Sequence, residues 1–314
     1  MSQTILIVGA TGKLGEPVAR QLLKEGYAVR VLARDPEKAR TKLGQAFEIV
    51  RGDVEQPASL PAALEGCHGV HISLAGGPTR ERYARVEFQG TANVAQAAAK
   101  QGLRRLTYLS GASVREENGW FYQIQAKLKA ETALRESGVA YSIFHCTWFM
   151  ESLRNLVQGK RAMLIGRQST PLHWIAAQDF ARMVAQAYRL PEAANKTFCV
   201  YGPGATPMQQ ALETYCALVR PDAKVSRMPI WLISIMGILS RDPRLADIAQ
   251  LMAYFEHYTE ADDPTETNTL LGAPTTILEH WCQAQRQLVA TPQPSLPMGG
   301  EARLWPTAPP TKLK

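Results

Sequence analysis

The sequence predicts an α/β fold in which helices cover both faces of a doubly wound parallel sheet. Two observations support this prediction. Short apolar runs alternate with segments of helical periodicity over the first 145 residues, and the first run ends in a glycine-rich segment that opens a helix. Repeated strand–helix–strand units are right-handed, so their strands lie parallel and both faces of the sheet are covered.

Six strands are expected in the first half of the chain. Thr4–Val8 is continuous, β-branched and followed by glycine, which is typical of a strand buried on both faces. The other five are the apolar runs 28–32, 47–50, 70–74, 106–109 and 141–144. Helices are expected where apolar positions recur on one face, at 15–25, 82–101 and 123–137.

After residue 145 the alternation loosens. The elements expected there are a strand at 197–201 and helices at 147–158, 207–219 and 247–257. A further helix is expected to begin at Asp179, whose side chain suits an N-cap.

No Gly-, Ser- or Pro-rich linker divides the chain before Val289. We therefore expect one dinucleotide-binding domain over residues 1–290, with insertions at 145–175 and 202–260 that form a smaller C-terminal substrate-capping region. Six prolines among residues 291–314, without periodicity, predict a disordered tail.

The composition is that of a globular protein. With 46% hydrophobic and 20% charged residues, it excludes the disordered, collagen-like and disulfide-scaffold classes. The net charge of +7 comes from scattered basic residues, so nucleic-acid binding is not expected.

The longest apolar run, Met228–Leu239, is interrupted by Pro229, Ser234 and Gly237 and is shorter than the roughly 20 residues that span a bilayer. We expect a helix packed over the sheet edge. The alternatives are a lid for a bulky apolar substrate and a peripheral contact with a membrane.

Cysteine and histidine positions argue against disulfides and metals. The five cysteines form no Cys-x-x-Cys pair, which suits reduced thiols in the cytoplasm. His68 and His71 lie three residues apart without a further ligand nearby, so no metal site is expected. The first four residues lack a basic segment, and no signal peptide is expected.

A glycine-rich segment follows the first strand and opens the first helix. Gly9 permits a tight turn, Gly12 lets backbone N–H groups approach a pyrophosphate, and Gly15 lets helix and strand pack closely. The N-terminus of the helix adds partial positive charge. The segment predicts a Rossmann-type dinucleotide site whose candidate phosphate-binding residues are Gly9, Ala10, Thr11, Gly12, Lys13, Leu14 and Gly15.

The Gly-x-x-Gly-x-x-Gly spacing resembles that of the short-chain dehydrogenase/reductase superfamily, in particular its atypical, NmrA-like branch. Residues 127–131 and 136–143 are most similar to divinyl chlorophyllide 8-vinyl reductases and their bacterial relatives. The resemblance covers about residues 4–260. Besides the glycine segment it rests on Arg34, Gly52-Asp53-Val54, Leu74-Ala75-Gly76, Ser110 and Lys127-x-x-x-Glu131.

The resemblance implies a nicotinamide cofactor. Arg34 lies where NAD-preferring folds place an acid, and a guanidinium there pairs with a 2′-phosphate, which favours NADP(H) over NAD(H). Asp35 is the competing candidate, because a carboxylate on the ribose favours NAD(H); however, Arg34 ends the strand and Asp35 begins a turn with Pro36.

Further cofactor contacts follow from the same resemblance. In the family, residues at the positions of Asp53 and Val54 hold the adenine; the alternative for Asp53 is a turn residue. The remaining candidate contacts, to the second ribose and the nicotinamide, are Leu74, Ala75, Gly76, Ser110 and Lys127.

The catalytic pattern departs from that of the family. Typical members use Tyr-x-x-x-Lys, and counting back from Lys127 places Gln123 at the tyrosine position. Tyr122 misses it by one residue, about 100° around a helix. We expect the usual proton relay to be absent and Lys127 to be the ribose anchor and candidate acid. The alternative is a surface lysine paired with Glu131 at i,i+4.

The segment after the sixth strand lines the nicotinamide and the substrate in family members. This chain has His145-Cys146 where relatives usually carry Arg-Pro, followed by Trp148 and Phe149, and these four are the candidate substrate-lining residues. His145 is either a proton donor or a hydrogen-bonded histidine at a strand end. No base is identifiable for Cys146.

Taken as a member of this family, the chain is expected to be a cytoplasmic NADP-dependent oxidoreductase, monomeric or dimeric. It would pass hydride between the nicotinamide and an apolar carbonyl or conjugated alkene. The missing tyrosine and the altered Arg-Pro position favour the alternative, a non-catalytic NAD(P)H-binding redox sensor or assembly factor.

Overall fold

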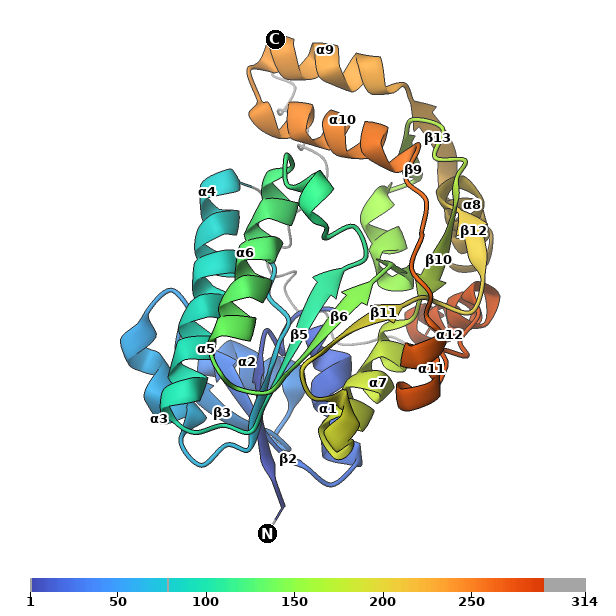
Figure 1. The fold of residues 1–314 in the computed structure, drawn as a ribbon. Coiled ribbons are helices and arrows are strands. Elements are labelled where there is room, and N and C mark those ends of the chain that lie inside the picture. Colours follow the sequence, from blue (N-terminus) through green and yellow to red (C-terminus); the bar gives the residue numbers. More distant parts are fainter. Residues whose placement is uncertain (1, 78, 291–314) are drawn as a thin grey trace.

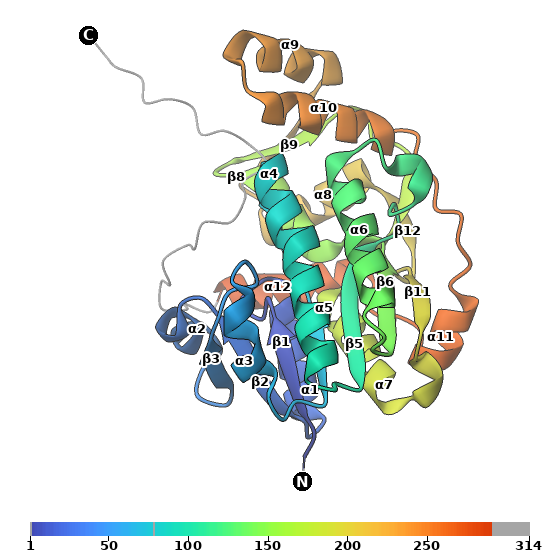
Figure 2. The same ribbon diagram turned by 60° about the vertical axis from the view of Figure 1, so that its left-hand side comes forward.

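A computed structural model describes residues 2–77 and 79–290 (Figures 1 and 2). Its centre is a seven-stranded parallel sheet in the order β11-β6-β5-β4-β1-β2-β3. The strands are β1 (Thr4–Val8), β2 (Ala28–Ala33), β3 (Glu48–Arg51), β4 (Gly69–Ile72), β5 (Arg105–Gly111), β6 (Tyr141–Cys146) and β11 (Lys196–Val200). The predicted doubly wound parallel sheet is confirmed.

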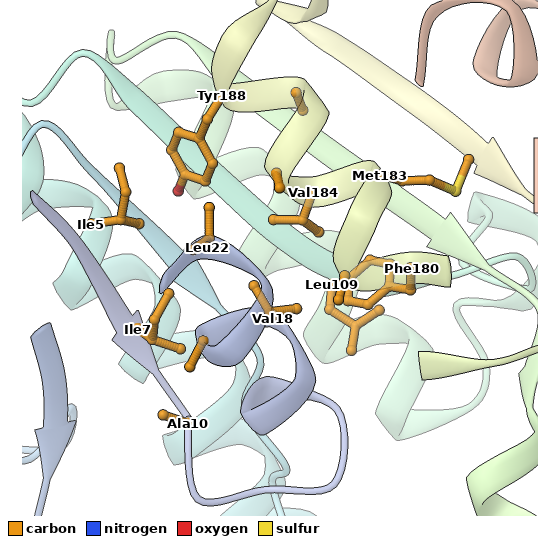
Figure 3. Close-up of a cluster of buried hydrophobic side chains, with 14 of the residues drawn as sticks. Ile5, Ile7, Ala10, Val18, Leu22, Leu109, Phe180, Met183, Val184 and Tyr188 are labelled. Carbon is orange, nitrogen blue, oxygen red and sulfur yellow. The ribbon is translucent and has the colours of Figure 1, made fainter. Parts of the chain in front are cut away.

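Helices cover both faces of this sheet. On one face lie α1 (Gly15–Lys24), α2 (Pro36–Leu43) and α7 (Ala177–Arg189), and on the other lie α3 (Leu60–Leu64), α5 (Thr91–Lys100) and α6 (Tyr122–Glu136). Alternate residues of β1 enter the two cores, because successive side chains of a strand point to opposite faces. Ile5 and Ile7 face α1 and α7, as Figure 3 shows.

Two helices depart from the prediction. Asp35 and Pro36 begin helix α2 instead of a turn: Asp35 is the N-cap and its carboxylate accepts the Lys38 N–H. The expected helix 82–101 begins earlier, as α4 (Arg80–Tyr83), and passes through a π-helical segment, η2 (Ala84–Gly90), before α5. Such π turns are rare and often lie at functional sites.

The expected helix at 147–158 is wrong. The segment contains β7 (Trp148–Phe149), a 3-10 helix η4 (Met150–Leu156) and β8 (Val157–Gln158). Strand β7 pairs in parallel with β10 (Pro171–Ile175), so tertiary pairing satisfies backbone groups that a helix would have paired internally.

Asp179 is not the N-cap of its helix, contrary to the prediction. Helix α7 begins two residues earlier, and a distant side chain, Glu151, accepts the Ala177 N–H at 3.1 Å. The Asp179 carboxylate instead accepts the backbone N–H groups of Thr275 and Thr276.

The chain that follows β6 and β11 adds structure at the carboxyl ends of the sheet strands (Figure 1). Two three-stranded sheets form there, with the orders β12-β10-β7 and β13-β9-β8. The added elements are β9 (Arg161–Ile165), β12 (Ala205–Pro207), α8 (Met208–Val219), β13 (Lys224–Met228), α9 (Ile230–Ser240), α10 (Pro243–Phe255), α11 (Thr265–Leu271) and α12 (Leu278–Ala290). Short 3-10 turns cover Pro57–Ser59, Glu116–Asn118 and Pro191–Ala193.

The apolar run 228–239 forms α9, but this helix does not pack over the sheet edge as expected. It packs against α10, and both stand at the end of the molecule (Figures 1 and 2). None of the described helices has both the length and the apolar character needed to cross a bilayer. The predicted tail, 291–314, lies outside the described residues, and the division into domains remains a prediction.

Candidate functional site

The candidate site lies where the chain changes direction across the sheet. Strands β1 and β4 are neighbours, yet the chain leads from β1 to β2 on one side and from β4 to β5 on the other. Ligands of open α/β sheets bind in the crevice that this arrangement leaves at the carboxyl ends of the strands. Two loops meet there: Gly9 follows β1, and Ser73 follows β4.

The glycines of the first loop fit the predicted roles. Gly9 has a positive φ of +93°, and a Cβ on it would lie 2.0 Å from the Ser73 carbonyl oxygen. A Cβ on Gly15 would lie 2.3 Å from the Gly9 oxygen, so the helix can approach the strand only with glycine at this position. At Gly12 the sole described neighbour is the Gly9 oxygen at 3.1 Å, which leaves the rest of its surroundings open.

The N-terminus of α1 therefore faces an open cradle. Its N-cap, Leu14, supplies no side-chain hydrogen bond to the first turn. Lys13 donates to the Asn155 side chain, and Lys42 donates to the Thr11 carbonyl oxygen at 2.8 Å. Both ammonium groups stay beside the loop, and Ala10 is buried beneath it. The glycine loop, an uncapped helix N-terminus and these two cations together suit an anionic ligand.

Arg34 and Asp35 differ in what holds their side chains. Asp35 caps α2 and is engaged with the Lys38 N–H at 3.1 Å. Arg34 is exposed at the end of β2 and pairs with no other residue in the described chain. One carboxylate oxygen of Asp35 is thus held by the cap, whereas the Arg34 side chain is exposed.

Asp53 and Val54 lie between β3 and α5. One carboxylate oxygen of Asp53 accepts the Glu55 N–H at 3.0 Å, so Asp53 does stabilise its own turn. Val54 is buried, its carbonyl oxygen accepts from Asn93, and its side chain lies against Gly90, where a Cβ would come within 2.7 Å. Leu74, Ala75 and Gly76 form the extended segment after β4, and Gly76 packs on the ring of Tyr83.

Lys127 extends from α6 to a fully buried carboxylate. Its ammonium donates to Glu87 Oε1 at 2.6 Å and to the Leu109 carbonyl oxygen at 3.3 Å. The Tyr108 hydroxyl donates to the same Glu87 oxygen at 2.8 Å. Burial, together with the nearby Glu87 charge, raises the pKa of Tyr108 well above its usual value, so the phenol stays neutral. Lys127 is thus fixed beneath the carboxyl end of β5.

The alternative pairing of Lys127 with Glu131 is wrong. Glu131 accepts instead from Ser110 Oγ at 2.6 Å, from His145 Nε2 at 2.8 Å and from Arg135 at 2.9 Å. Burial alone would raise the pKa of Glu131, but these hydrogen bonds hold it below its usual value. Ser110 and His145 sit opposite each other on β5 and β6, and one carboxylate binds both.

Gln123 takes the place of the family's tyrosine. Its amide donates to the Tyr122 hydroxyl at 3.2 Å. Tyr122 stacks edge-on to Tyr83, at 5.7 Å between ring centroids, and lies under the Arg80 guanidinium. Tyr122 therefore belongs to an aromatic contact with α4 and is not a displaced substitute for the missing tyrosine.

Of the four candidate substrate-lining residues, only Cys146 and Phe149 come together, in the core that contains α1 and α7. His145 faces α6, whereas its neighbour Cys146 faces α1 and α7 from the opposite side of the sheet. Burial raises the pKa of the Cys146 thiol well above its usual value, which keeps it unreactive. Phe149 packs edge-on to Phe180, and Trp148 packs on Phe255 in another core.

Glu87 is the residue that sequence reasoning missed. A lone carboxylate within the packing face of the helical run 82–101 was the available indication, since buried acids are rare unless they are paired. Its partner lies 40 residues away, and the π-helical segment that carries Glu87 breaks the regular helical spacing. Tyr108 was missed for a related reason: as a strand residue it looks like ordinary core.

Comparison with known proteins shows the family to which the chain belongs. The family model described as NAD(P)H-binding matches residues 9–191, more than half of the chain. Photosystem II assembly factor Ycf39 of Trieres chinensis is 26% identical over 74% of this chain and 75% of its own length. The chloroplastic divinyl chlorophyllide a 8-vinyl-reductase of Zea mays is 27% identical over 81% of this chain and 70% of its own length, which confirms the resemblance stated from the sequence.

Among solved structures, the triphenylmethane reductase of Citrobacter sp., complexed with NADP(H), superposes with a TM-score of 0.70 at 21% identity. The alignment covers 90% of this chain and 99% of that one, and supports the fold alone. The glycine cradle lies at the start of the family match, and Glu87, Lys127 and Glu131 lie within it. By sequence, fold and the form of its glycine loop, the chain belongs to the NAD(P)H-binding family.

Proposed function

We propose that the chain is an NADP(H)-dependent reductase that delivers hydride to an apolar carbonyl or conjugated alkene. The observation that supports this most directly is the fixed position of Lys127, held by Glu87 at 2.6 Å near the carboxyl end of β5. A lysine on this helix is what the resemblance assigns to the nicotinamide ribose. An ion pair with a fully buried acid orients it before any ligand arrives.

The residues present fit a dinucleotide. Gly9, Gly12 and the N-terminus of α1 would hold the pyrophosphate, with Lys13 close by. Val54 offers an apolar surface to the adenine, and the free oxygen of Asp53 can accept a hydrogen bond from it. The 74–76 segment and Ser110 complete the proposed set. When bound, the cofactor supplies the hydride.

We infer a preference for NADP(H) from the two side chains at the end of β2. Asp35 is engaged as the N-cap of α2, while the Arg34 guanidinium is exposed. Arginine binds phosphate through two parallel hydrogen bonds, a geometry that a ribose hydroxyl cannot match.

The absence of the family's tyrosine favours one of the two proposed reactions, the addition of hydride to a conjugated alkene. Reduction of a carbonyl needs a proton at the oxygen, whereas hydride addition to a conjugated alkene can be completed by a proton from elsewhere. His145 is the candidate donor for that proton: Glu131 accepts from its Nε2–H and fixes the ring, and the imidazolium form would give up the proton on Nδ1. Gln123 in the tyrosine position is compatible with the alkene reaction.

The test is single-turnover oxidation of NADPH across a panel of apolar enones and quinones, followed by the loss of reduced-nicotinamide absorbance. We expect turnover with at least one acceptor and a slower rate for Lys127→Ala. Because that change strands the buried Glu87 carboxylate, Lys127→Ala/Glu87→Ala is measured beside it, and Lys129→Ala on the exposed side of α6 is the control. Unchanged turnover in both Lys127 variants would remove this lysine from the mechanism.

A second function, a non-catalytic NAD(P)H-binding assembly factor or redox sensor, is favoured by two observations. Ycf39 is described as an assembly factor, and Ser110 and Gln123 are engaged in internal hydrogen bonds. Tight NADPH binding without turnover on any acceptor, together with a co-purifying partner protein, would favour this function over the reductase.

The cellular location and the oligomeric state are further parts of the proposal. The five free cysteines suit a reducing compartment such as the cytoplasm. We propose a monomer or dimer that takes a small apolar substrate and does not bind nucleic acid.

A further inference from the structure

Helix α9 exposes an apolar face that the described residues leave uncovered. Seven large apolar side chains are exposed in the described part of the chain, and five of them lie on this one helix. They are Trp231, Ile235, Met236, Ile238 and Leu239. Trp231, Ile238 and Leu239 expose 63%, 77% and 79% of their surface. An exposed apolar patch this concentrated marks an interaction surface.

The exposed residues form a stripe along the helix. Positions 231, 235, 238 and 239 follow the spacing of one helical face, whereas the buried residues Ile233 and Gly237 lie on the opposite face and pack on α10. The helix is therefore apolar on both sides, but only one side is covered. Figures 1 and 2 show α9 on the side of α10 that faces away from the sheet.

The side-chain hydroxyl groups of α9 donate hydrogen bonds within the helix. Ser234 donates to the Ile230 carbonyl oxygen and Ser240 to that of Met236, both one turn earlier. Because both hydroxyl groups already donate to backbone carbonyls, this surface can be buried away from water without leaving a side-chain donor unpaired.

The charged residues beside the stripe indicate which kind of surface it binds. Residues 223–241 contain no Asp or Glu, and the two acids that border them, Asp222 and Asp242, pair with Arg220 and Arg244. Of the bases in this segment, Arg227 donates to Gln209, while Lys224 precedes the helix and Arg241 follows it directly. Arg241 has no partner among the described residues, and Asp247, the acid on α10, is buried in an ion pair with Arg80. An apolar stripe with cationic ends complements a surface that is anionic outside and apolar inside.

We propose that α9 seats on a lipid bilayer with anionic headgroups, inserting Trp231, Ile235, Ile238 and Leu239 to the depth of the headgroup boundary. Arg241, the C-cap of the helix, then contacts the headgroups, and the Trp231 indole lies where its apolar ring and its polar N–H both find suitable surroundings. The contact is peripheral and reversible.

The experiment is co-sedimentation of the full chain with phosphatidylcholine vesicles, with and without phosphatidylglycerol. We expect binding that requires phosphatidylglycerol, weakens with added salt, and falls more than tenfold in Ile238→Ser/Leu239→Ser. The matched control is Ile277→Ser, a 40% exposed residue away from α9. Because the altered side chains are exposed, the thermal midpoint of both variants should match that of the wild type.

Insertion and surface adsorption are separated by brominated lipids. These quench a tryptophan that enters the acyl region, so wild-type fluorescence should fall more than that of Trp231→Phe. Equal vesicle binding by wild type and Ile238→Ser/Leu239→Ser would overturn the proposal, as would no vesicle binding at all. A dimer that this double variant dissociates, without vesicle binding, would assign the stripe to a second copy of the chain instead.

Discussion

The pairing of Glu87 with Lys127 makes the sharpest prediction for the site. The two charges lie 2.6 Å apart, which corresponds to an attraction of about 6 kcal/mol at an effective dielectric constant of about 20. Glu87→Gln keeps the shape and an acceptor oxygen but removes the charge, and it also removes the cost of burying a carboxylate. The removed cost of burying a carboxylate offsets part of the lost attraction. Removing one partner of a buried pair typically costs 3–5 kcal/mol, and we expect about 3 kcal/mol because Lys127 is partly exposed.

Urea unfolding measures this loss, and binding of NADPH to the folded variant measures its functional consequence. We expect weaker binding, because Lys127 is no longer fixed toward the crevice. Glu81→Gln, an exposed acid six residues earlier in the same helical run, is the control and should change stability by less than about 0.5 kcal/mol. If Glu87→Gln were as stable as the control and bound NADPH as tightly as wild type, the claim that Glu87 positions Lys127 would be refuted.

Three further predictions concern cofactor choice, the glycine cradle and pH. Arg34→Ser should weaken NADPH binding by roughly 10- to 150-fold, the value of one or more charge-assisted hydrogen bonds, and leave NADH binding unchanged in calorimetry; equal losses for both would exclude 2′-phosphate recognition. Gly12→Ala places the added Cβ 3.1 Å from the Gly9 carbonyl oxygen, so the loop must shift by a few tenths of an ångström and the thermal midpoint should fall slightly. It should also reduce NADPH affinity about tenfold or more relative to Gly204→Ala, whose Cβ meets none of the described atoms within 4 Å. Burial lowers the pKa of His71 to about 3, so the unfolded chain takes up a proton near pH 6.5 that the folded chain refuses, and stability falls as the pH drops below that value. Between about pH 7.5 and pH 5 His71 should account for a loss of about 2 kcal/mol in urea unfolding, and His71→Gln, which has no such proton, should lose correspondingly less.

The parts of this protein that the sequence predicts well are those determined by a few consecutive residues. Strand β1 and the loop after it follow from a continuous run rich in β-branched residues and from the glycine that ends it, which has a positive φ in the structure. Helix α10 shows a local indication that was overlooked. Asp242 and Pro243 are an N-cap and a first helical residue, and they start the helix four residues before the expected position.

Contacts between residues far apart in the sequence determine the features that were not predicted. Trp148 and Phe149 form a strand because β10 lies beside them, and Ala177 can start α7 because Glu151 reaches it from 26 residues away. The partner of Lys127 was out of reach for the same reason. Helical spacing favoured Glu131, but Ser110, His145 and Arg135 already occupy that carboxylate. Only the fold brings Glu87 to the lysine.

The central claim is that the loop from Gly9 to Gly15 and the N-terminus of α1 receive the diphosphate of a nicotinamide dinucleotide. Titration calorimetry of the purified chain with NADPH, NADP⁺, NADH and NAD⁺ tests it most directly. We expect saturable association with one nucleotide per chain, tightest for the NADP forms. No heat of binding from any of the four at millimolar concentration would contradict it.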